Sequence, residues 1–355
     1  MRTITIFCIL FLPNFCEAQV NYIDYHRDII KAENLFLAGK FQQSLFSYNN
    51  CFAKYPKAFV KDIFIATQIA CLQNDSAMLS FFLNEGFKKG LPWRMVENDS
   101  NISTYLKQLP KEFIIRLKNS FFNGRTFYLS NINLSLRYKI LIMSQIDQLY
   151  HEFPRDISIP INRDSLYATI LDANMDSIMN VIYLYGYPGE HLIGINNSED
   201  DKADCFPNYE QQLVEPTPIF FYHNECAFQQ LSKQLYQSIL SGDLHPREYA
   251  LMYEWSFNEF RYKKDTTGTE IEMDGEIIRI MPTNIPIKPC KTIQETERYG
   301  IDKSIQSFNN APVNDNKINA DRAKIGIASI SHDRLKKDFE KKYHVKLFFG
   351  MFCEL

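Results

Sequence analysis

The residues of this sequence that could do acid–base chemistry are few, and they lie in its second half. Asp147 and His151 are four positions apart, so they share one face of a helix. Such a pair could orient its histidine as a carboxylate does in hydrolases, or be an exposed ion pair, which is the commoner meaning of this spacing. His223 follows the apolar run 218–222 and is either a general base or a histidine that is hydrogen-bonded within the core.

A further cation, Arg322, could bind a carboxylate or a phosphate, or pair with acids on a solvated helix. The sequence contains no Gly-x-Ser-x-Gly elbow, phosphate loop, dinucleotide fingerprint or His-Glu-x-x-His zinc motif. His223 and Cys226 resemble one half of a zinc site, but no second pair follows at ligand spacing. The sequence therefore predicts no cofactor and no metal, and it disfavours the enzyme classes that carry strong local motifs.

The chain has the size and composition of a folded protein of about two domains. It has 355 residues and a mass of 41.7 kDa, and 45% of its residues are hydrophobic, which is enough to form real cores. Its net charge of −3 and its pI near 6.2 argue against a nucleic-acid partner, because neutralising phosphates needs a basic surface. The 28 Phe and 20 Tyr against 13 Gly favour packed helices over a glycine-rich cofactor fold.

Residues 1–18 have the pattern of a secretory signal peptide. A basic start precedes an apolar run over 3–15, and the small residues Cys16 and Ala18 stand at the −3 and −1 positions. A membrane anchor is the alternative, but this run is shorter than the roughly 20 apolar residues that a span requires. We therefore expect cleavage after Ala18, no transmembrane segment, and an exported protein that is periplasmic or extracellular.

Removal of this peptide leaves six of the 8 cysteines, because Cys8 and Cys16 are lost with it. The remaining ones are Cys51, Cys71, Cys205, Cys226, Cys290 and Cys353. Six cysteines allow 15 pairings, and the sequence does not choose among them. Their low density in a chain of this length favours buried free thiols over a disulfide scaffold.

Residues 25–58 have the spacing of two helices packed as an antiparallel hairpin. The small, aromatic and helix-ending positions are Gly39, Phe41, Ser44, Tyr48, Cys51 and Pro56. Small residues let two helices approach, so Ser44 and Cys51 should face the first helix, and the proline ends the second one. The pattern resembles a tetratricopeptide repeat. A degenerate second copy is expected over 59–92, with Ala66 and Phe82 in the equivalent places.

Such repeats are more often scaffolds that bind peptides or proteins than enzymes, although a short array can merely brace its neighbour. Short helices are expected over 91–119, and the asparagines and glycine of 121–136 indicate a domain junction. A helix over about 136–153 follows. Its apolar stripe should face the core and turn Asp147 and His151 to the other side. The stripe consists of Ile142, Ile146, Leu149 and Phe153.

The later helices are recognised by their 3.6-residue pattern. They are expected over about 172–185, with Gly186 as the cap, and over 223–240, 246–260, 317–325 and 333–343. Asp274-Gly275 predicts a β-hairpin between 270–273 and 276–281. The acidic stretch 195–218 favours a solvated insertion over a functional cover, and 344–352 could add an edge strand.

Residues 137–330 resemble a bacterial domain family of unknown function that is found in exported or lipid-anchored proteins. The matching positions are Asp147-Gln148 with position 151, Asp172 and Asn174, Gly186-Tyr187-Pro188, His223, Tyr249-Ala250-Leu251 with Glu254, Tyr299-Gly300, and Asn319 with Arg322 before Gly326. The chain departs from the family at His151, where arginine is usual, and at Glu254-Trp255, where an Asp-Arg pair is usual. The resemblance implies a polar site with an altered charge pattern, in which Asp147 and His151 point toward His223 and Tyr299.

Together these patterns predict a mainly α fold, with tetratricopeptide-like hairpins followed by a helical domain that contains a small β-hairpin. The expected divisions are a signal peptide (1–18), a tetratricopeptide-like domain (19–120), a linker (121–136), a helical domain of unknown function (137–330), and a C-terminal helix with an extended tail (331–355).

Two functions from different classes follow. The favoured one is a protein- or peptide-interaction module, whose partner is a protein or peptide and not a nucleic acid. The alternative is a hydrolase that acts on a cell-envelope or peptide substrate through a histidine and a carboxylate. In that case the catalytic residues would be His223, Asp147 and His151, and the binding residues would be Glu254, Tyr299 and Arg322.

Overall fold

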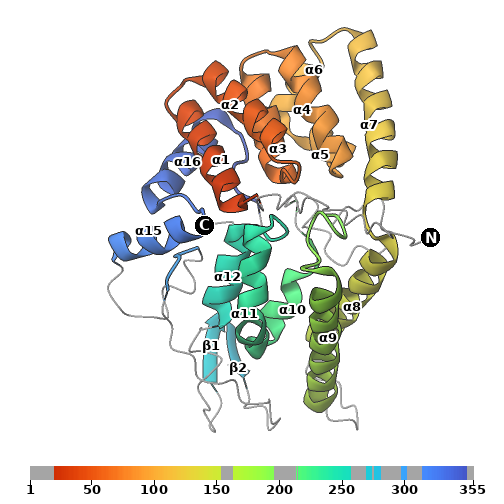
Figure 1. The fold of residues 1–355 in the computed structure, drawn as a ribbon, viewed down its shortest axis with the longest axis vertical. Helices are drawn as coiled ribbons and strands as arrows, with labels where there is room; N and C mark the ends of the chain where they lie inside the picture. The colour runs from red at the N-terminus through yellow and green to blue at the C-terminus, as the bar shows by residue number, and fades with distance from the viewer. Residues whose placement is uncertain are drawn as a thin grey trace, which may run out of the picture.

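The computed structural model describes residues 20–152, 163–195, 213, 215–256, 269–273, 276–280, 297–301 and 314–349. Within these residues the protein is mainly helical, which confirms the expected class (Figure 1). Figure 1 shows helices α1–α6 grouped at one end of the molecule and α9–α12 at the other, with α7 and α8 along one side. The predicted signal peptide and residues 196–212 of the acidic stretch 195–218 lie outside the described residues. At the end of this stretch Leu213, Glu215 and Thr217 are buried, so the expected solvated insertion is wrong for them.

The helices fall into three groups along the chain. The first group contains α1 (Tyr22–Leu37), α2 (Phe41–Lys54), α3 (Val60–Leu72), α4 (Ser76–Lys88), α5 (Trp93–Asn98), α6 (Ser100–Leu106) and α7 (Lys111–Asn131). The second contains α8 (Leu134–Glu152), α9 (Arg163–Tyr185), α10 (Pro218–His223), α11 (Glu225–Leu240) and α12 (Pro246–Ser256). The last two are α15 (Asp315–Lys324) and α16 (Ile330–Tyr343).

Helices α1 and α2 form the predicted hairpin. Gly39 occupies the turn with φ 76°, a conformation that glycine adopts without the penalty of a Cβ. Ser44 is fully buried, and its hydroxyl donates to the carbonyl of Ala32 across the helix pair at 2.8 Å. Cys51 faces α1 as well, with its Sγ 3.8 Å from the carbonyl oxygen of Tyr25. The predicted register of the hairpin is therefore confirmed.

Helices α3 and α4 repeat this arrangement. Ala66 and Phe82, the expected small and aromatic positions, are both fully buried. Asp75 caps α4, because its carboxylate accepts the backbone N–H of Met78 at 3.0 Å. Helix α4 in turn packs against α7. The chain thus forms two successive helix hairpins before α5.

The first hydrophobic core contains residues from α1–α7 and is completed by the end of the chain. Phe339 of α16 packs on Phe36 of α1, and Val345 and 347–349 are buried against the same cluster. Gln68 of α3 fastens this tail by two hydrogen bonds of 2.7 Å to the backbone of Lys346. The tail at 344–349 contains no strand, so the expected edge strand is wrong for these residues. Its backbone is satisfied by side chains, such as that of Gln68, instead of by a sheet.

The second hydrophobic core lies among α8–α12. Its members include Ile178 of α9, Phe221 of α10, Leu235 of α11 and Met252 of α12. Gly186 ends α9 with φ 84°, as the sequence predicts. Helix α9 begins at Arg163, nine residues before the expected start at Asp172.

Helix α8 turns the opposite face to the core from the one expected. Ile142, Ile146 and Leu149 are 54%, 41% and 59% exposed, whereas Arg137 and Asp147 are buried at 1% and 0%. The arginine is accommodated because its guanidinium donates to the carbonyl of Ile193 at 2.8 Å. The expectation of a buried apolar stripe is therefore wrong. The fourth member of that stripe, Phe153, lies outside the described residues.

Other local expectations have mixed outcomes. Helix α7 continues through Asn123 and Gly124, so much of the expected linker 121–136 is helical. The divisions into domains stay a prediction. The structure pairs β1 (Thr269–Met273) with β2 (Glu276–Ile280) as antiparallel strands, with Met273 opposite Glu276.

Polar contacts join the first group of helices to the second. Lys57 forms an ion pair with Asp243 at 2.6 Å. The backbone N–H of Val60, at the start of α3, donates to the Glu190 carboxylate at 2.7 Å. These contacts place the start of α3 against the turns that follow α9 and α11, and several buried charged residues gather there.

Candidate functional site

The sequence-predicted pair of Asp147 and His223 is in contact. Helix α8 supplies the carboxylate and the last residue of α10 supplies the imidazole, and Asp147 Oδ2 meets His223 Nδ1. The Asp147 side chain is fully buried and that of His223 is 10% exposed. A carboxylate on Nδ1 fixes the ring and directs Nε2 away from it, as in a histidine general base. The expected contact is confirmed, and a catalytic role stays a prediction. His151 lies in α8, but its side chain lies outside the described part of the chain.

Glu254, Tyr299 and Arg322 form a second group, around the segment 297–301. The Glu254 carboxylate accepts the backbone N–H groups of Tyr299 at 2.7 Å, of Ile301 at 3.0 Å, and of Gly300. Burial raises its pKa, and these hydrogen bonds act in the opposite direction. The carboxylate therefore holds the segment in place from inside the fold.

Arg322 holds the same segment from the other side. Its guanidinium donates to the carbonyls of Tyr299 and Gly300 and, at 2.8 Å, to the carboxylate of Asp333. Arg322 is only 1% exposed. The Tyr299 hydroxyl donates to Glu297 at 2.5 Å. These contacts explain the spacing of the three residues as a scaffold for the loop, and a binding role for them stays a prediction.

A third polar group lies between the two cores and was not expected from the sequence. His26 of α1, Asp62 of α3 and His245, which precedes α12, offer ligand atoms that all lie within 4.8 Å of one another. The two imidazole rings meet edge to face at 4.9 Å, and both pack on Phe59. The hydroxyl of Tyr25 donates to Asp62 Oδ2 at 2.7 Å.

Buried carboxylates continue this polar region toward the second core. Glu190, Glu215 and Glu248 are 3%, 2% and 1% exposed, and the partly compensating cation is Lys61, 3.8 Å from Glu248. Burial and the neighbouring Glu215 raise the pKa of Glu190 to about 8. Burial also raises the pKa of Glu215 to about 7. At neutral pH the protein therefore keeps Glu190 largely protonated, because several carboxylates cannot ionise together in a dry site.

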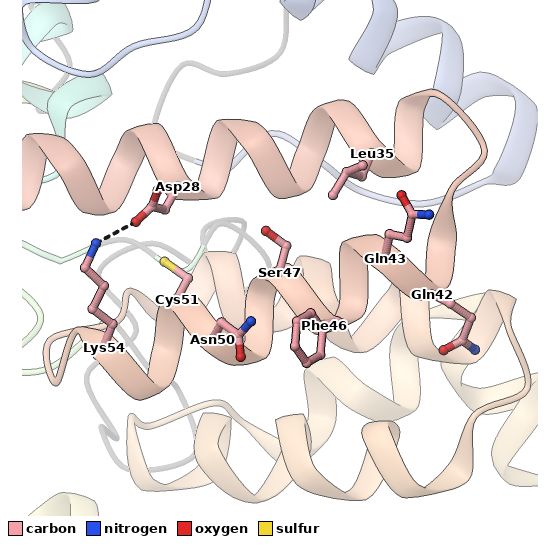
Figure 2. A pocket seen from close by; sticks show the side chains of 9 residues that line it. All are labelled: Asp28, Leu35, Gln42, Gln43, Phe46, Ser47, Asn50, Cys51 and Lys54. Atoms are coloured by element: carbon pink, nitrogen blue, oxygen red, sulfur yellow. Dashed lines mark hydrogen bonds and ion pairs between the residues drawn. The ribbon is translucent and has the colours of Figure 1, made fainter.

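The first hairpin carries an open groove of about 640 Å³ on its outer side. Figure 2 shows Asp28 and Leu35 of α1 on one side of it and, from α2, Gln42, Gln43, Phe46, Ser47, Asn50, Cys51 and Lys54. Phe46 is 67% exposed. Asp28 and Lys54 form an ion pair at 3.0 Å, so this end of the groove carries little net charge.

No known protein family, curated protein or solved structure matches this chain. The function is therefore argued from the geometry of these three groups and the groove. Among the described helices, none combines the length and the apolar composition needed to cross a membrane. Cys51 and Cys71 are buried free thiols, in agreement with the expectation, and burial raises the pKa of both. Neither thiol is therefore activated as a nucleophile.

The sequence signals for the unexpected residues are weak. His26 lies among charged and aromatic residues of an ordinary helix, and His245 precedes a proline. Asp62 follows Lys61 in a helix that is otherwise apolar. A run of charge at the start of so apolar a helix is the one local hint, because charged residues are rarely buried without partners.

Proposed function

We propose that the protein is an exported protein- or peptide-interaction module that binds an extended peptide segment in the groove of the first hairpin. Helices α1 with α2 and α3 with α4 pack as hairpins, which is compatible with tetratricopeptide repeats, and their assignment as such repeats is part of this proposal. The observation that carries the proposal is the exposed Phe46 in a groove that also presents the amide side chains of Gln42, Gln43 and Asn50.

The groove offers the chemistry that an extended peptide needs. Gln43, Ser47 and Asn50 recur at helical spacing along one face of α2, so their donors and acceptors form a row. Amide and hydroxyl groups can pair with both the N–H and the C=O groups of a backbone that has no internal partner. Phe46 and Leu35 would contact one apolar side chain of the peptide, and removing them from water would provide the driving force.

The charges around the groove favour a segment with little charge of its own. Asp28 is held by Lys31 at 2.7 Å and by Lys54 at 3.0 Å. Burial opposes ionisation of Asp28, but its hydrogen bonds with these lysines outweigh burial and lower its pKa. Because this carboxylate and these cations are paired already, a strongly acidic or basic peptide gains little from them.

The test is binding of the purified protein to an array of short synthetic peptides of mixed sequence. Phe46→Ser and Gln43→Ala should each lower the affinity for the peptides that the wild type retains by about tenfold or more, as changes at binding hot spots do. Phe81→Ser is the matched control, because Phe81 is an exposed phenylalanine of α4 (40%) outside the groove. Retention of the same peptides by Phe46→Ser with unchanged affinity would contradict the proposal.

A second candidate function, supported by the contact between Asp147 and His223, is a hydrolase that acts on a peptide or cell-envelope substrate. His223 would be the general base and Asp147 would orient it. Hydrolysis of a mixed fluorogenic peptide library by the wild type, lost in both His223→Gln and Asp147→Asn, would support this candidate. Hydrolysis that persists in His223→Gln would remove it.

Export is tested separately. If the protein crosses a membrane through a cleaved signal peptide, the mature form recovered outside the cytoplasm should begin at Gln19. Amino-terminal sequencing that finds Met1 on the exported protein would contradict this part of the proposal.

A further inference from the structure

Three side chains from distant parts of the chain converge on one buried point between the two cores. His26, Asp62 and His245 are 3%, 5% and 9% exposed, and their ligand atoms lie within 4.8 Å of one another. His26 Nε2 is buried and has no hydrogen-bond partner among the described residues. A buried polar atom without a partner costs free energy, so a native structure that keeps one calls for an explanation. A bound ion is such an explanation.

The protonation of the three groups suits a metal. Burial, together with Lys61, lowers the pKa of His26 to about 3 and that of His245 well below its usual value. Both imidazoles are therefore uncharged at pH 7 and keep a lone pair. Burial raises the pKa of Asp62 to about 6, which still leaves a carboxylate at pH 7. Metal ligands must be deprotonated, and all three meet that condition at neutral pH.

The positively charged side chains around the site would repel a metal ion less than isolated cations would, because each lies near a carboxylate. Each cation that acts on His245 from a neighbouring element has a carboxylate partner. The pairs are Lys61 with Glu248, Lys336 with Glu33, and Arg247 with Asp333. The ion would consequently meet one ligand carboxylate, Asp62, and cations that each lie near a carboxylate of their own, and the buried Asp62 would gain a positive partner.

Space for the ion and a further ligand lies beside the three side chains. They line a cavity of about 50 Å³. One water requires roughly 10–15 Å³ of such space, so the cavity has room for an ion with a water. It leaves no room for an organic cofactor, which would need a pocket of some 300 Å³ or more.

From this arrangement we infer that His26, Asp62 and His245 bind one Zn²⁺ ion, with a water as the fourth ligand. Two imidazoles and a carboxylate suit Zn²⁺ in a tetrahedral site, whereas Ca²⁺ and Mg²⁺ prefer oxygen ligands throughout. His245 Nδ1 now accepts the backbone N–H of Arg247 at 3.2 Å. Binding through Nε2 moves the ring proton to Nδ1 and releases that N–H. The ion joins α1 and α3 to the start of α12 and so clamps the hairpins to the second half.

The experiment is a Zn²⁺ titration of the purified, metal-stripped full chain in competition with a chromophoric chelator, with thermal unfolding followed in parallel. The wild type should bind one Zn²⁺ per chain and unfold at a higher temperature with it. His26→Gln and His245→Gln should weaken binding by about 100-fold or more, since even changes outside the ligand set cost 10- to 100-fold. His191→Gln is the matched control. His191 is half-buried, has a pKa lowered to about 3, and packs on Phe59, but it is not one of the three ligands.

A second measurement keeps the proposal testable if the variants do not fold. Co²⁺ added to the wild type should give the visible bands of a four-coordinate site, without the near-ultraviolet band of a sulfur ligand. Failure of the wild type to bind Zn²⁺, a sulfur band in the Co²⁺ spectrum, or unchanged Zn²⁺ affinity in His26→Gln would each overturn the inference. None of these readouts depends on peptide binding, so this inference and the proposed function can fail independently.

Discussion

The first hairpin and helix α8 differ in how sequence relates to burial. In α1–α2 the small and aromatic residues that the pattern places inside, such as Ser44 and Tyr48, are fully buried. In α8 the pattern fails, because Ile142 and Ile146 are exposed while Arg137 and Asp147 are buried. The helices of the hairpin and helix α8 are all amphipathic by sequence. Apolar spacing alone therefore does not decide which face of a helix lies inside.

Helix α8 buries a mixed face, on which Leu136, Ile140 and Leu141 lie beside polar groups that have partners. Arg137 reaches a backbone carbonyl and Asp147 meets His223, so each has a partner that makes its burial tolerable. The hairpin also buries charge, because Glu33 of α1 pairs with His332 and Lys336 of α16, but the contact between α1 and α2 follows the apolar pattern. Variants of the buried residues of α8 should therefore destabilise the protein far more than variants of its exposed apolar residues, such as Ile146.

A large effect is expected from Asp147→Ala. Removing the buried carboxylate takes away a hydrogen-bond partner of the His223 imidazole, and the free energy of unfolding should fall by about 1–3 kcal/mol. Asp172→Ala, at an exposed aspartate of α9, is the control and should change it by less than about 0.5 kcal/mol. Urea unfolding of both variants measures the difference, and equal stability of the two would mean that the buried face of α8 is not held by this pair.

The next effect concerns the carboxylates between the cores and depends on pH. The pKa of Glu190 is raised from 4.5 to about 8, so its contribution to stability is complete below about pH 4.5 and is lost as the pH rises to about 8. Glu190→Gln removes this loss. Between pH 5 and pH 8 the variant should gain roughly 2–3 kcal/mol over the wild type, at about 1.4 kcal/mol per pKa unit. Urea unfolding at the two pH values tests this, with the exposed Glu112→Gln as the control, and parallel pH profiles would contradict it.

Overpacking the hairpin should have an effect of similar size. Ser44→Trp forces a large ring between α1 and α2 and should lower the free energy of unfolding by roughly 1–3 kcal/mol. Ala53→Trp places the same ring on the exposed side of α2 and serves as the control. Thermal melting of both variants measures the effect. An unchanged melting curve for Ser44→Trp would show that Ser44 does not pack between α1 and α2.

The smallest effect is expected from Ile146→Ser. Since Ile146 is 41% exposed, this change should alter the free energy of unfolding by about 0.5 kcal/mol or less. Ile140→Ser, at a fully buried isoleucine of the same helix, should cost several times more. A larger loss in the free energy of unfolding for Ile146→Ser than for Ile140→Ser, measured by chemical unfolding, would favour the orientation of α8 that the apolar spacing predicts.

The parts of the fold that sequence could predict are those set by local chemistry. Gly39 marks the first turn because few other residues adopt its backbone conformation, and Gly186 ends α9 for the same reason. The contact of Asp147 with His223 was also predicted, although on a mistaken premise about the opposite face of α8. Local pattern thus located the turns and most helices.

The candidate zinc site could not be predicted in this way. His26, Asp62 and His245 lie on three elements that only the packing of the first group of helices against the second brings together. Their spacing along the chain matches no ligand motif, because the motif exists only in the folded molecule. The start of α9 was missed for a different reason. Asn162 and Asp164 are residue types favoured at a helix start, but they were not used as such a signal.

The docking of the C-terminal tail on the first hairpins sets the order in which the protein can fold. Phe36 and Gln68, near the beginning of the chain, contact Phe339 and Lys346 near its end. Contacts of such long sequence separation form late and slow the folding of a domain. During synthesis the hairpins therefore emerge with part of their apolar surface uncovered and remain incomplete until nearly the whole chain has left the ribosome.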